Sequence, residues 1–180
     1  MTTEARAFVG VDVGGTKVLA VALGATGDDV RGDARTPTPD SADELIDAIC
    51  DTAATAAKEA GAPLGAIAVG VPGLVDDQGV MRFAANLPGL VELPLRDIFA
   101  KKLGVPVVID NDANVAAWGE RCVGAGAGAN DMLMVTIGTG IGGGIVLGGN
   151  LCRGAHGMAG EIGHSVVQLD GEQCQCGQKG

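Results

Sequence analysis

Two glycine-rich turns, each between apolar runs of β-like pattern, constrain this chain more than any other feature. The first turn reads Asp12-Val13-Gly14-Gly15-Thr16-Lys17, and the second lies within Val135–Gly144. Because glycine has no Cβ, backbone N–H groups in such turns can come close to an anion. Between the turns lies a polar segment with two carboxylates, Asp110–Asn114. Two anion-binding turns and a carboxylate predict phosphoryl transfer rather than phosphate binding alone.

Composition excludes several classes of protein. Apolar residues make up 47% of the 180 residues but aromatic ones only 2%, so a core of small aliphatic side chains is expected. The net charge of −10 argues against nucleic-acid and anionic-membrane partners. Asp12 and glycines interrupt the best apolar runs, and Met1–Glu4 lacks the pattern of a secretory signal. Five cysteines without a secretory context favour a reducing cytosol and a metal site. We therefore expect a cytoplasmic protein.

The hydrophobic pattern predicts an α/β protein that begins with a β-meander. Alternating runs predict strands over 7–13, 17–24 and 29–35. A helix is expected over 42–60, capped by Ser41 or Asp40 and ending before Gly61. Its buried face should consist of four aliphatic side chains, Leu45, Ile46, Ile49 and Ala53.

Further along, the pattern predicts a strand over 66–71, a helix over 94–103, a strand over 105–109 and a helix over 113–122. Asp110–Asn114 would then occupy a strand-to-helix turn. The glycine-rich stretch 124–128 predicts a boundary between a domain of residues 1–123 and one of residues 124–180. A second strand–turn–strand begins at Met132, so the second domain repeats the start of the first. Two such halves facing one another would form a cleft.

The first turn lacks the spacing of a Walker motif. We interpret it as a hairpin whose amides at Gly14 and Gly15, together with the Thr16 hydroxyl and Lys17, hold terminal phosphates. Asp12, at the end of its strand, could hold Mg²⁺ directly or through water. The alternative is an ordinary tight hairpin, in which Gly-Gly is common.

The second turn matches the dinucleotide-binding fingerprint in its letters, and Glu161 lies near the expected acidic position. That fingerprint requires a helix to begin at its last glycine, whereas Gly144–Gly149 has the pattern of a strand bounded by glycines. A nicotinamide site is therefore rejected and a phosphate-binding hairpin retained. Its candidate phosphate contacts are Thr136, Gly138, Thr139 and Gly140.

Three polar side chains, Asn111, Asp112 and Asn114, lie where a strand meets a helix. Helix capping explains one of them and would be the default for an isolated pair. Ligands, however, gather at this edge of α/β sheets. A carboxylate there can accept the proton of a sugar hydroxyl as a phosphoryl group arrives.

A carboxylate and an imidazole, Glu161 and His164, lie three residues apart among glycines, and both can bind vicinal hydroxyls. Ten residues beyond His164 comes a Cys-x-Cys-Gly sequence containing Cys174 and Cys176. One His and two Cys supply three ligands for zinc, which takes four in structural sites. The alternative is two unpaired surface thiols. The remaining cysteines fall in helical or strand patterns and are expected in the core: Cys50, Cys122 and Cys152.

These motifs, in this order along nearly the whole chain, resemble those of the ROK family of repressors and sugar kinases, especially its bacterial glucokinase branch. The turn at Asp12–Lys17 resembles the family's first phosphate motif, and Thr136–Gly144 resembles the second. Asp110–Asn114 is similar to the catalytic segment. Gly160–His164 resembles the sugar-binding Glu-x-Gly-His motif, and Cys174–Gly177 the start of the zinc motif.

The resemblance implies a two-lobed, actin-like ATPase fold of the ribonuclease H-like type, with ATP, Mg²⁺ and a hexose in the cleft. It implies that Asp112 is the general base acting on the sugar 6-hydroxyl, most simply that of glucose. Sugar hydroxyls would be held by Asn111, Glu161 and His164, with backbone contact at Gly73 and a weaker contribution from Asn86. It further implies structural Zn²⁺ on His164, Cys174 and Cys176, and a homo-oligomer at full length.

Family members continue well beyond 180 residues, so the resemblance predicts an N-terminal fragment that is inactive alone. The fourth zinc cysteine and the adenosine-binding part would follow Gly180. Other sugars (fructose, allose or N-acetylmannosamine), and polyphosphate or ADP as donor, stay open. A sugar-responsive repressor shares the fold, but only about six residues precede the first strand, too few for a DNA-binding segment. A zinc-stabilised sugar-binding module without catalysis is the third alternative.

Overall fold

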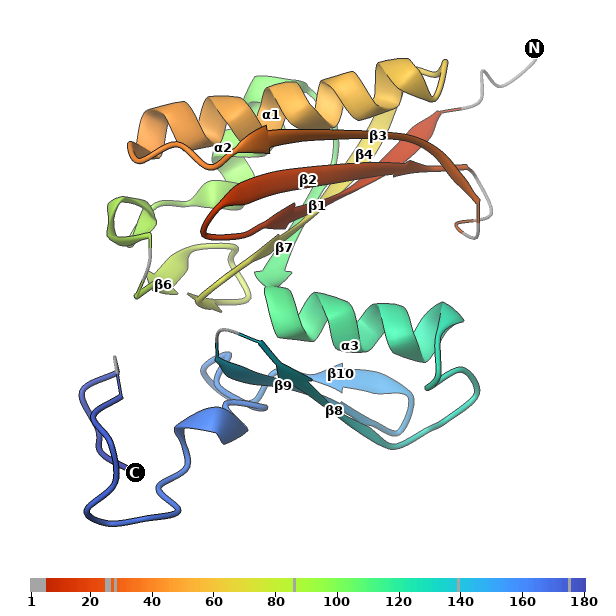
Figure 1. The fold of residues 1–180 in the computed structure, drawn as a ribbon. Helices are drawn as coiled ribbons and strands as arrows, with labels where there is room; N and C mark the ends of the chain where they lie inside the picture. Colours follow the sequence, from red (N-terminus) through yellow and green to blue (C-terminus); the bar gives the residue numbers. More distant parts are fainter. Residues whose placement is uncertain (1–5, 25–26, 28, 86, 139, 175) are drawn as a thin grey trace. The chain divides into compact units, whose positions relative to one another are not determined.

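The computed structural model describes residues 6–24, 27, 29–85, 87–138, 140–174 and 176–180. The chain divides into two compact units, Met1–Asp112 and Ala113–Gly180. Figure 1 labels most of the helices and strands of the two units. Among the described helices, none has both the length and the apolar character needed to cross a membrane.

A five-stranded sheet forms the first unit, in the order β3-β2-β1-β4-β7. The predicted meander is confirmed as β1 (Ala7–Val13), β2 (Lys17–Leu23) and β3 (Val30–Pro37), paired antiparallel. β4 (Leu64–Val71) adds in parallel to β1, and β7 (Val107–Asn111) adds in parallel to β4. Alternate residues of β1 are buried, so Asp12 lies on the face opposite the buried one.

The helix α1 (Ala42–Glu59) packs on this sheet, as Figure 1 shows for β2 and β3. Ser41 caps it, because its side chain accepts a hydrogen bond from the Glu44 N–H at 3.3 Å. The chain leaves the helix at Gly61, whose φ of 71° lies in the left-handed region. The four predicted face residues are confirmed as buried: Leu45, Ile46, Ile49 and Ala53.

The shorter helix α2 (Leu95–Leu103) ends at Gly104, also left-handed, and buries Phe99 completely. Before it, β5 (Leu74–Val75) and β6 (Met81–Phe83) form a two-stranded ribbon, followed by the 3₁₀ turn η1 (Pro88–Leu90). Arg82 ties this ribbon together, because its guanidinium lies 2.8 Å from Asp76 and 2.6 Å from Glu92. Met81, Leu90, Leu95 and Phe99 from these segments belong to the apolar core of the first unit.

The polar segment after β7 differs from the prediction. β7 begins two residues later than expected and includes Asp110 and Asn111, because parallel pairing with β4 continues as far as Val71 opposite Asn111. The helix α3 (Asp112–Val123) then begins at the next residue. The predicted turn is therefore absent in this described segment, and a strand leads directly into a helix.

The second unit repeats the meander, as predicted. β8 (Met132–Ile137), β9 (Ile141–Leu147) and β10 (Asn150–Cys152) form an antiparallel sheet in the order β10-β9-β8. β9 also contacts η2 (Ile162–His164). β9 is a strand at the place where the dinucleotide-binding fingerprint requires a helix.

The expectation that three cysteines lie in the core is correct for one of them. Cys50 is buried in α1, and burial raises the pKa of its thiol to about 11. Cys152 is half-buried. Cys122 is exposed near the end of α3, because the helix directs Ala113 and Ala117 rather than Cys122 to its buried side.

Candidate active site

The first glycine turn is a hairpin that the chain closes on itself. The Gly14 N–H donates to the Lys17 carbonyl at 2.9 Å, so this amide is already occupied within the turn. Gly15, Thr16 and Lys17 are exposed at its tip, and Asp12 is exposed at the end of β1. The amides of Gly15 and Thr16 are therefore better placed than that of Gly14 to meet an anion.

Thr38, which sequence reasoning missed, braces this hairpin from outside. Its hydroxyl donates to the Gly14 carbonyl at 2.7 Å, and its N–H donates to the Thr16 carbonyl at 3.2 Å. Gly15 and Thr38 also line a small cavity of about 130 Å³ beside the start of α1. Position 38 carried no signal in the sequence, because only the return of β3 brings it back to the turn.

The second turn is closed in the same way. The Gly138 N–H donates to the Gly140 carbonyl at 2.9 Å, and the register pairs Thr136 with Gly142. A Cβ built on Gly142 would lie 2.7 Å from the Thr136 hydroxyl and 3.2 Å from Ala113, so Thr136 faces the side of the sheet that α3 covers. Thr139 lies outside the described residues, as does Asn86.

Asn111 is fixed at the edge of the first unit. Its Nδ2 donates to the Gly73 carbonyl at 3.1 Å, and its backbone N–H donates to the Asp110 carboxylate at 2.8 Å. Gly73 has a φ of 150°, and a Cβ there would clash with the Phe83 carbonyl. Because its Nδ2 is bound to the Gly73 carbonyl, the side chain of Asn111 is held in one orientation. The backbone that it contacts, at Gly73, requires glycine.

Asp112 is the first residue of α3 and is exposed, while Asp110 before it is buried. An accessible carboxylate next to the anchored Asn111 is what a base acting on a bound hydroxyl requires. The prediction that both glycine hairpins face Asp112 concerns the placement of the two units and stays a prediction.

The turn that carries Glu161 and His164 sits directly on β9. A Cβ on Gly163 would clash with the Ile141 carbonyl, and one on Gly160 would lie 2.5 Å from the Gly143 carbonyl. Both glycines are therefore required by backbone contact. The 3₁₀ turn places residues three apart on the same side, and Glu161 Oε2 lies 3.6 Å from His164 Nε2.

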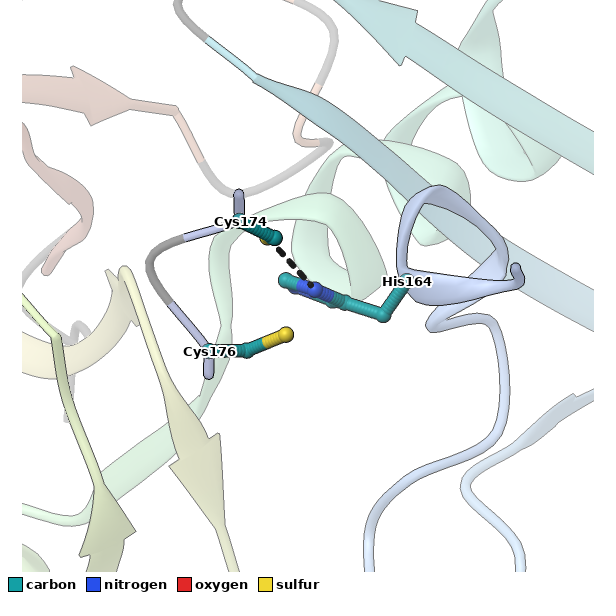
Figure 2. A group of neighbouring side chains, drawn as sticks. All are labelled: His164, Cys174 and Cys176. Atoms are coloured by element: carbon teal, nitrogen blue, oxygen red, sulfur yellow. Dashed lines mark hydrogen bonds between the residues drawn. The ribbon is translucent and has the colours of Figure 1, made fainter. Parts of the chain in front are cut away.

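The other nitrogen of His164 faces the cysteines, as Figure 2 shows. Nδ1 lies 3.5 Å from Cys174 Sγ, and the ligand atoms of His164, Cys174 and Cys176 lie within 4.8 Å of one another. A tetrahedral zinc ion holds nitrogen and sulfur ligands roughly 3.6 Å apart, given Zn–N and Zn–S bonds of about 2.1 and 2.3 Å. The three donors fit that ion.

The loop that presents the cysteines is a knuckle. The Cys174 N–H donates to the Gln178 carbonyl at 2.8 Å, and the Gly177 N–H returns to the Cys174 carbonyl at 3.0 Å. Hydrogen bonds from the Cys176 N–H first, then from the Cys176 thiol and His164, hold the pKa of Cys174 below its ordinary value. A thiol shifted toward thiolate is the form that binds a metal.

Comparison with known proteins decides the family. The model of the ROK family matches residues 8–180. The chain belongs to the ROK family. A ROK glucokinase from Streptomyces griseus, crystallised with glucose and AMPPNP, has a TM-score of 0.88 at 42% identity, covering 97% of this chain and 55% of that one. The actin-like ATPase fold predicted from the sequence is thereby confirmed.

Curated ROK relatives differ in the sugar they are named for. A glucokinase of Halalkalibacterium halodurans is 41% identical over 182 residues, covering 97% of this chain and 54% of that protein. An N-acetylmannosamine kinase of Shigella flexneri is 34% identical over 174 residues, covering 96% of this chain and 58% of that protein. The chain thus spans little more than half the length of the ROK relatives it matches.

Proposed function

We propose that this chain belongs to an ATP-dependent hexokinase that transfers the γ-phosphoryl group of ATP to the 6-hydroxyl of glucose. The observation that carries the proposal is the anchored Asn111 followed by the exposed Asp112, on a fold shared with a glucokinase named with glucose and AMPPNP. We propose that residues 1–180 carry the sugar-binding and proton-accepting part of this activity. Turnover requires more chain than this.

Asp112 is the proposed general base. As the sugar 6-oxygen attacks the γ-phosphorus, the hydroxyl proton passes to the Asp112 carboxylate and the bond from phosphorus to the leaving oxygen of ADP breaks. Asn111, Glu161 and His164 hold the sugar hydroxyls, and the backbone at Gly73 adds a contact. Most of the rate enhancement comes from this positioning and from fixed backbone dipoles.

The proposed phosphate contacts come from the two glycine hairpins. The amides of Gly15 and Thr16, the Thr16 hydroxyl and Lys17 are supported by their exposure at the tip of the first hairpin. In the second hairpin the proposed contacts are Thr136, Gly138, Thr139 and Gly140. Asp12 would hold Mg²⁺, which when bound neutralises phosphate charge. The exposed carboxylate at the end of β1 fits that role.

Zinc is the proposed structural metal, held by His164, Cys174 and Cys176 with a fourth donor still to be identified. It would crosslink the knuckle to the turn that carries Glu161. Free thiols at all the described cysteines support a reducing, cytoplasmic compartment. The acidic charge supports small-molecule partners over nucleic acid, and we keep a homo-oligomer as part of the proposal.

A panel of sugars assayed with MgATP tests the proposal. Any longer chain that contains this sequence should phosphorylate glucose faster than fructose, allose or N-acetylmannosamine. Residues 1–180 assayed alone should give no turnover. Preference for N-acetylmannosamine would reassign the substrate, and turnover by residues 1–180 would contradict the proposed division of labour.

Replacing the proposed base separates catalysis from binding. Asp112→Asn should lower kcat by about 10²–10⁴-fold, because the amide cannot accept the proton, while glucose affinity changes little. Isothermal titration with glucose and a coupled assay measure the two effects on one longer chain that contains this sequence, because residues 1–180 alone should give no turnover. Asp110→Asn is the matched control at the neighbouring carboxylate, where an oxygen acceptor for the Asn111 N–H is retained and kcat should largely survive. If Asp112→Asn keeps its turnover, the base is elsewhere.

A further inference from the structure

His164 has two ring nitrogens with different neighbours. Nδ1 lies 3.5 Å from Cys174 Sγ, within the three-donor cluster, and Nε2 lies 3.6 Å from the Glu161 carboxylate. An imidazole that binds a metal through one nitrogen carries its proton on the other, and a carboxylate facing that N–H fixes the tautomer and the ring orientation. The imidazole of His164 therefore lies between the Glu161 carboxylate and the thiols of the two cysteines.

We propose that Glu161 is a positioning residue for the metal, in addition to its proposed contact with the sugar. At 3.6 Å, which is an electrostatic contact longer than a hydrogen bond, its carboxylate favours the Nε2–H form of His164, so that the Nδ1 lone pair is left for the space shared with Cys174 and Cys176. The inference rests on the proposed function only for the sugar contact. The role of Glu161 toward the metal is argued only from the geometry of the second unit, Ala113–Gly180.

The backbone supports this role of Glu161. Gly160 and Gly163 press the turn against β9, and the His164 N–H donates to the Glu161 carbonyl at 3.1 Å. The backbone positions of Glu161 and His164 are therefore fixed relative to one another. A change at Glu161 is expected to act through the orientation of the imidazole rather than by unfolding the turn.

One consequence links the metal to the sugar. The same carboxylate would orient a metal ligand and accept a sugar hydroxyl. Metal and sugar would then meet through one pair of side chains, Glu161 and His164. Binding of the metal would then change the affinity for the sugar, and binding of the sugar would change the affinity for the metal by the same factor.

Metal affinity measured without sugar or nucleotide tests the inference. Zn²⁺ is titrated into residues 1–180 against a chromogenic chelator, using wild type, Glu161→Gln and Glu172→Gln. Glu172→Gln removes the same charge from an exposed position near the knuckle. Glu161→Gln should weaken Zn²⁺ binding by about 10–100-fold, and Glu172→Gln by less than about twofold. Equal affinities for all three proteins would overturn the inference.

Two further readouts exclude a purely structural effect. The metal-free forms of wild type and Glu161→Gln should have the same circular dichroism, and Co²⁺ should give thiolate charge-transfer bands of the same energy at a higher Co²⁺ concentration. Glu161→Asp, which keeps a retracted carboxylate, should have an intermediate affinity even if the Gln variant folds poorly. An affinity of Glu161→Asp equal to that of wild type would contradict the role. None of these results depends on turnover, so failure of the kinase proposal is recognised separately.

Discussion

The two glycine hairpins occupy equivalent places in two β-meanders, yet they are held by different means. The first, between β1 and β2, belongs to a five-stranded sheet and is braced by the Thr38 side chain. The second, between β8 and β9, belongs to a three-stranded sheet in which Gly142, Gly143 and Gly144 bring neighbouring backbone and small side chains close on both faces. Both turns are closed by a backbone hydrogen bond. The first is also braced by a side chain, whereas the second leads into a strand whose glycines allow close packing.

The cores of the two units differ in the same sense. The described apolar core cluster lies entirely between Ala7 and Ile109. In the described part of the second unit the buried apolar side chains are Ala113, Ala117 and Val146. Several large apolar side chains are exposed there, among them Leu133, Ile137, Val167 and Leu169. We therefore expect apolar burial to contribute most of the stability of the first unit, and close backbone contacts to contribute more in the described part of the second.

Removing a large core side chain should have the largest effect on the difference in stability between the two units. Phe99→Ala is expected to lower the free energy of unfolding of the first unit by about 3–5 kcal/mol, because Phe99 is fully buried. Phe8→Ala, where the ring is 46% exposed, is the matched control and should cost roughly 1 kcal/mol.

Two probes can tell the units apart during denaturation. Trp118 is the only tryptophan and lies in α3, so its fluorescence reports on the second unit, while far-ultraviolet circular dichroism also includes the first. Phe99→Ala should shift the circular-dichroism transition and leave the Trp118 transition nearly in place. If both transitions shift together, the two units unfold cooperatively and their cores are not independent.

A glycine substitution in each unit tests whether close backbone contacts matter more in the second unit than in the first. Gly163→Ala should cost about 1–3 kcal/mol in the second unit, because the new methyl group clashes with the Ile141 carbonyl. It should also weaken Zn²⁺ binding by separating His164 from the cysteines. Gly10→Ala on β1 meets nothing within 4 Å and should change stability by less than about 0.5 kcal/mol. Denaturation followed by Trp118 fluorescence measures the first, and equal effects of the two changes would refute the contact-based account.

Local patterns predicted the elements well where a single period or cap decides them. The alternation along β1, the Ser41 cap and the stop at Gly61 all follow from neighbours in the sequence. The end of β7 was misplaced because its last pairs depend on β4, about forty residues earlier. Cys122 was misjudged because the side of α3 that is buried is set by β9 rather than by the helix itself.

The candidate site shows the same division. The spacing of Glu161 and His164 and the Cys-x-Cys sequence predicted three residues that the structure brings together. The imidazole has the Glu161 carboxylate on one side and the cysteine thiols on the other. This arrangement depends on a 3₁₀ turn and on contact with β9, and neither can be predicted from the sequence pattern. Thr38 could not be found because a lone threonine after a strand has many uses.

The smallest expected effect concerns that threonine. Thr38→Val keeps the shape and the N–H bond to Thr16 but removes the hydroxyl bond to Gly14, which should weaken the hairpin by about 1 kcal/mol. One kcal/mol is roughly a fivefold factor, so exchange of the Gly14 amide should accelerate about fivefold. Thr55→Val, which removes a similar hydroxyl bond on the exposed side of α1, is the control and should leave that amide unchanged. Hydrogen exchange read by NMR measures both. An unchanged Gly14 amide in Thr38→Val would mean that the first hairpin, like the second, is held by its backbone alone.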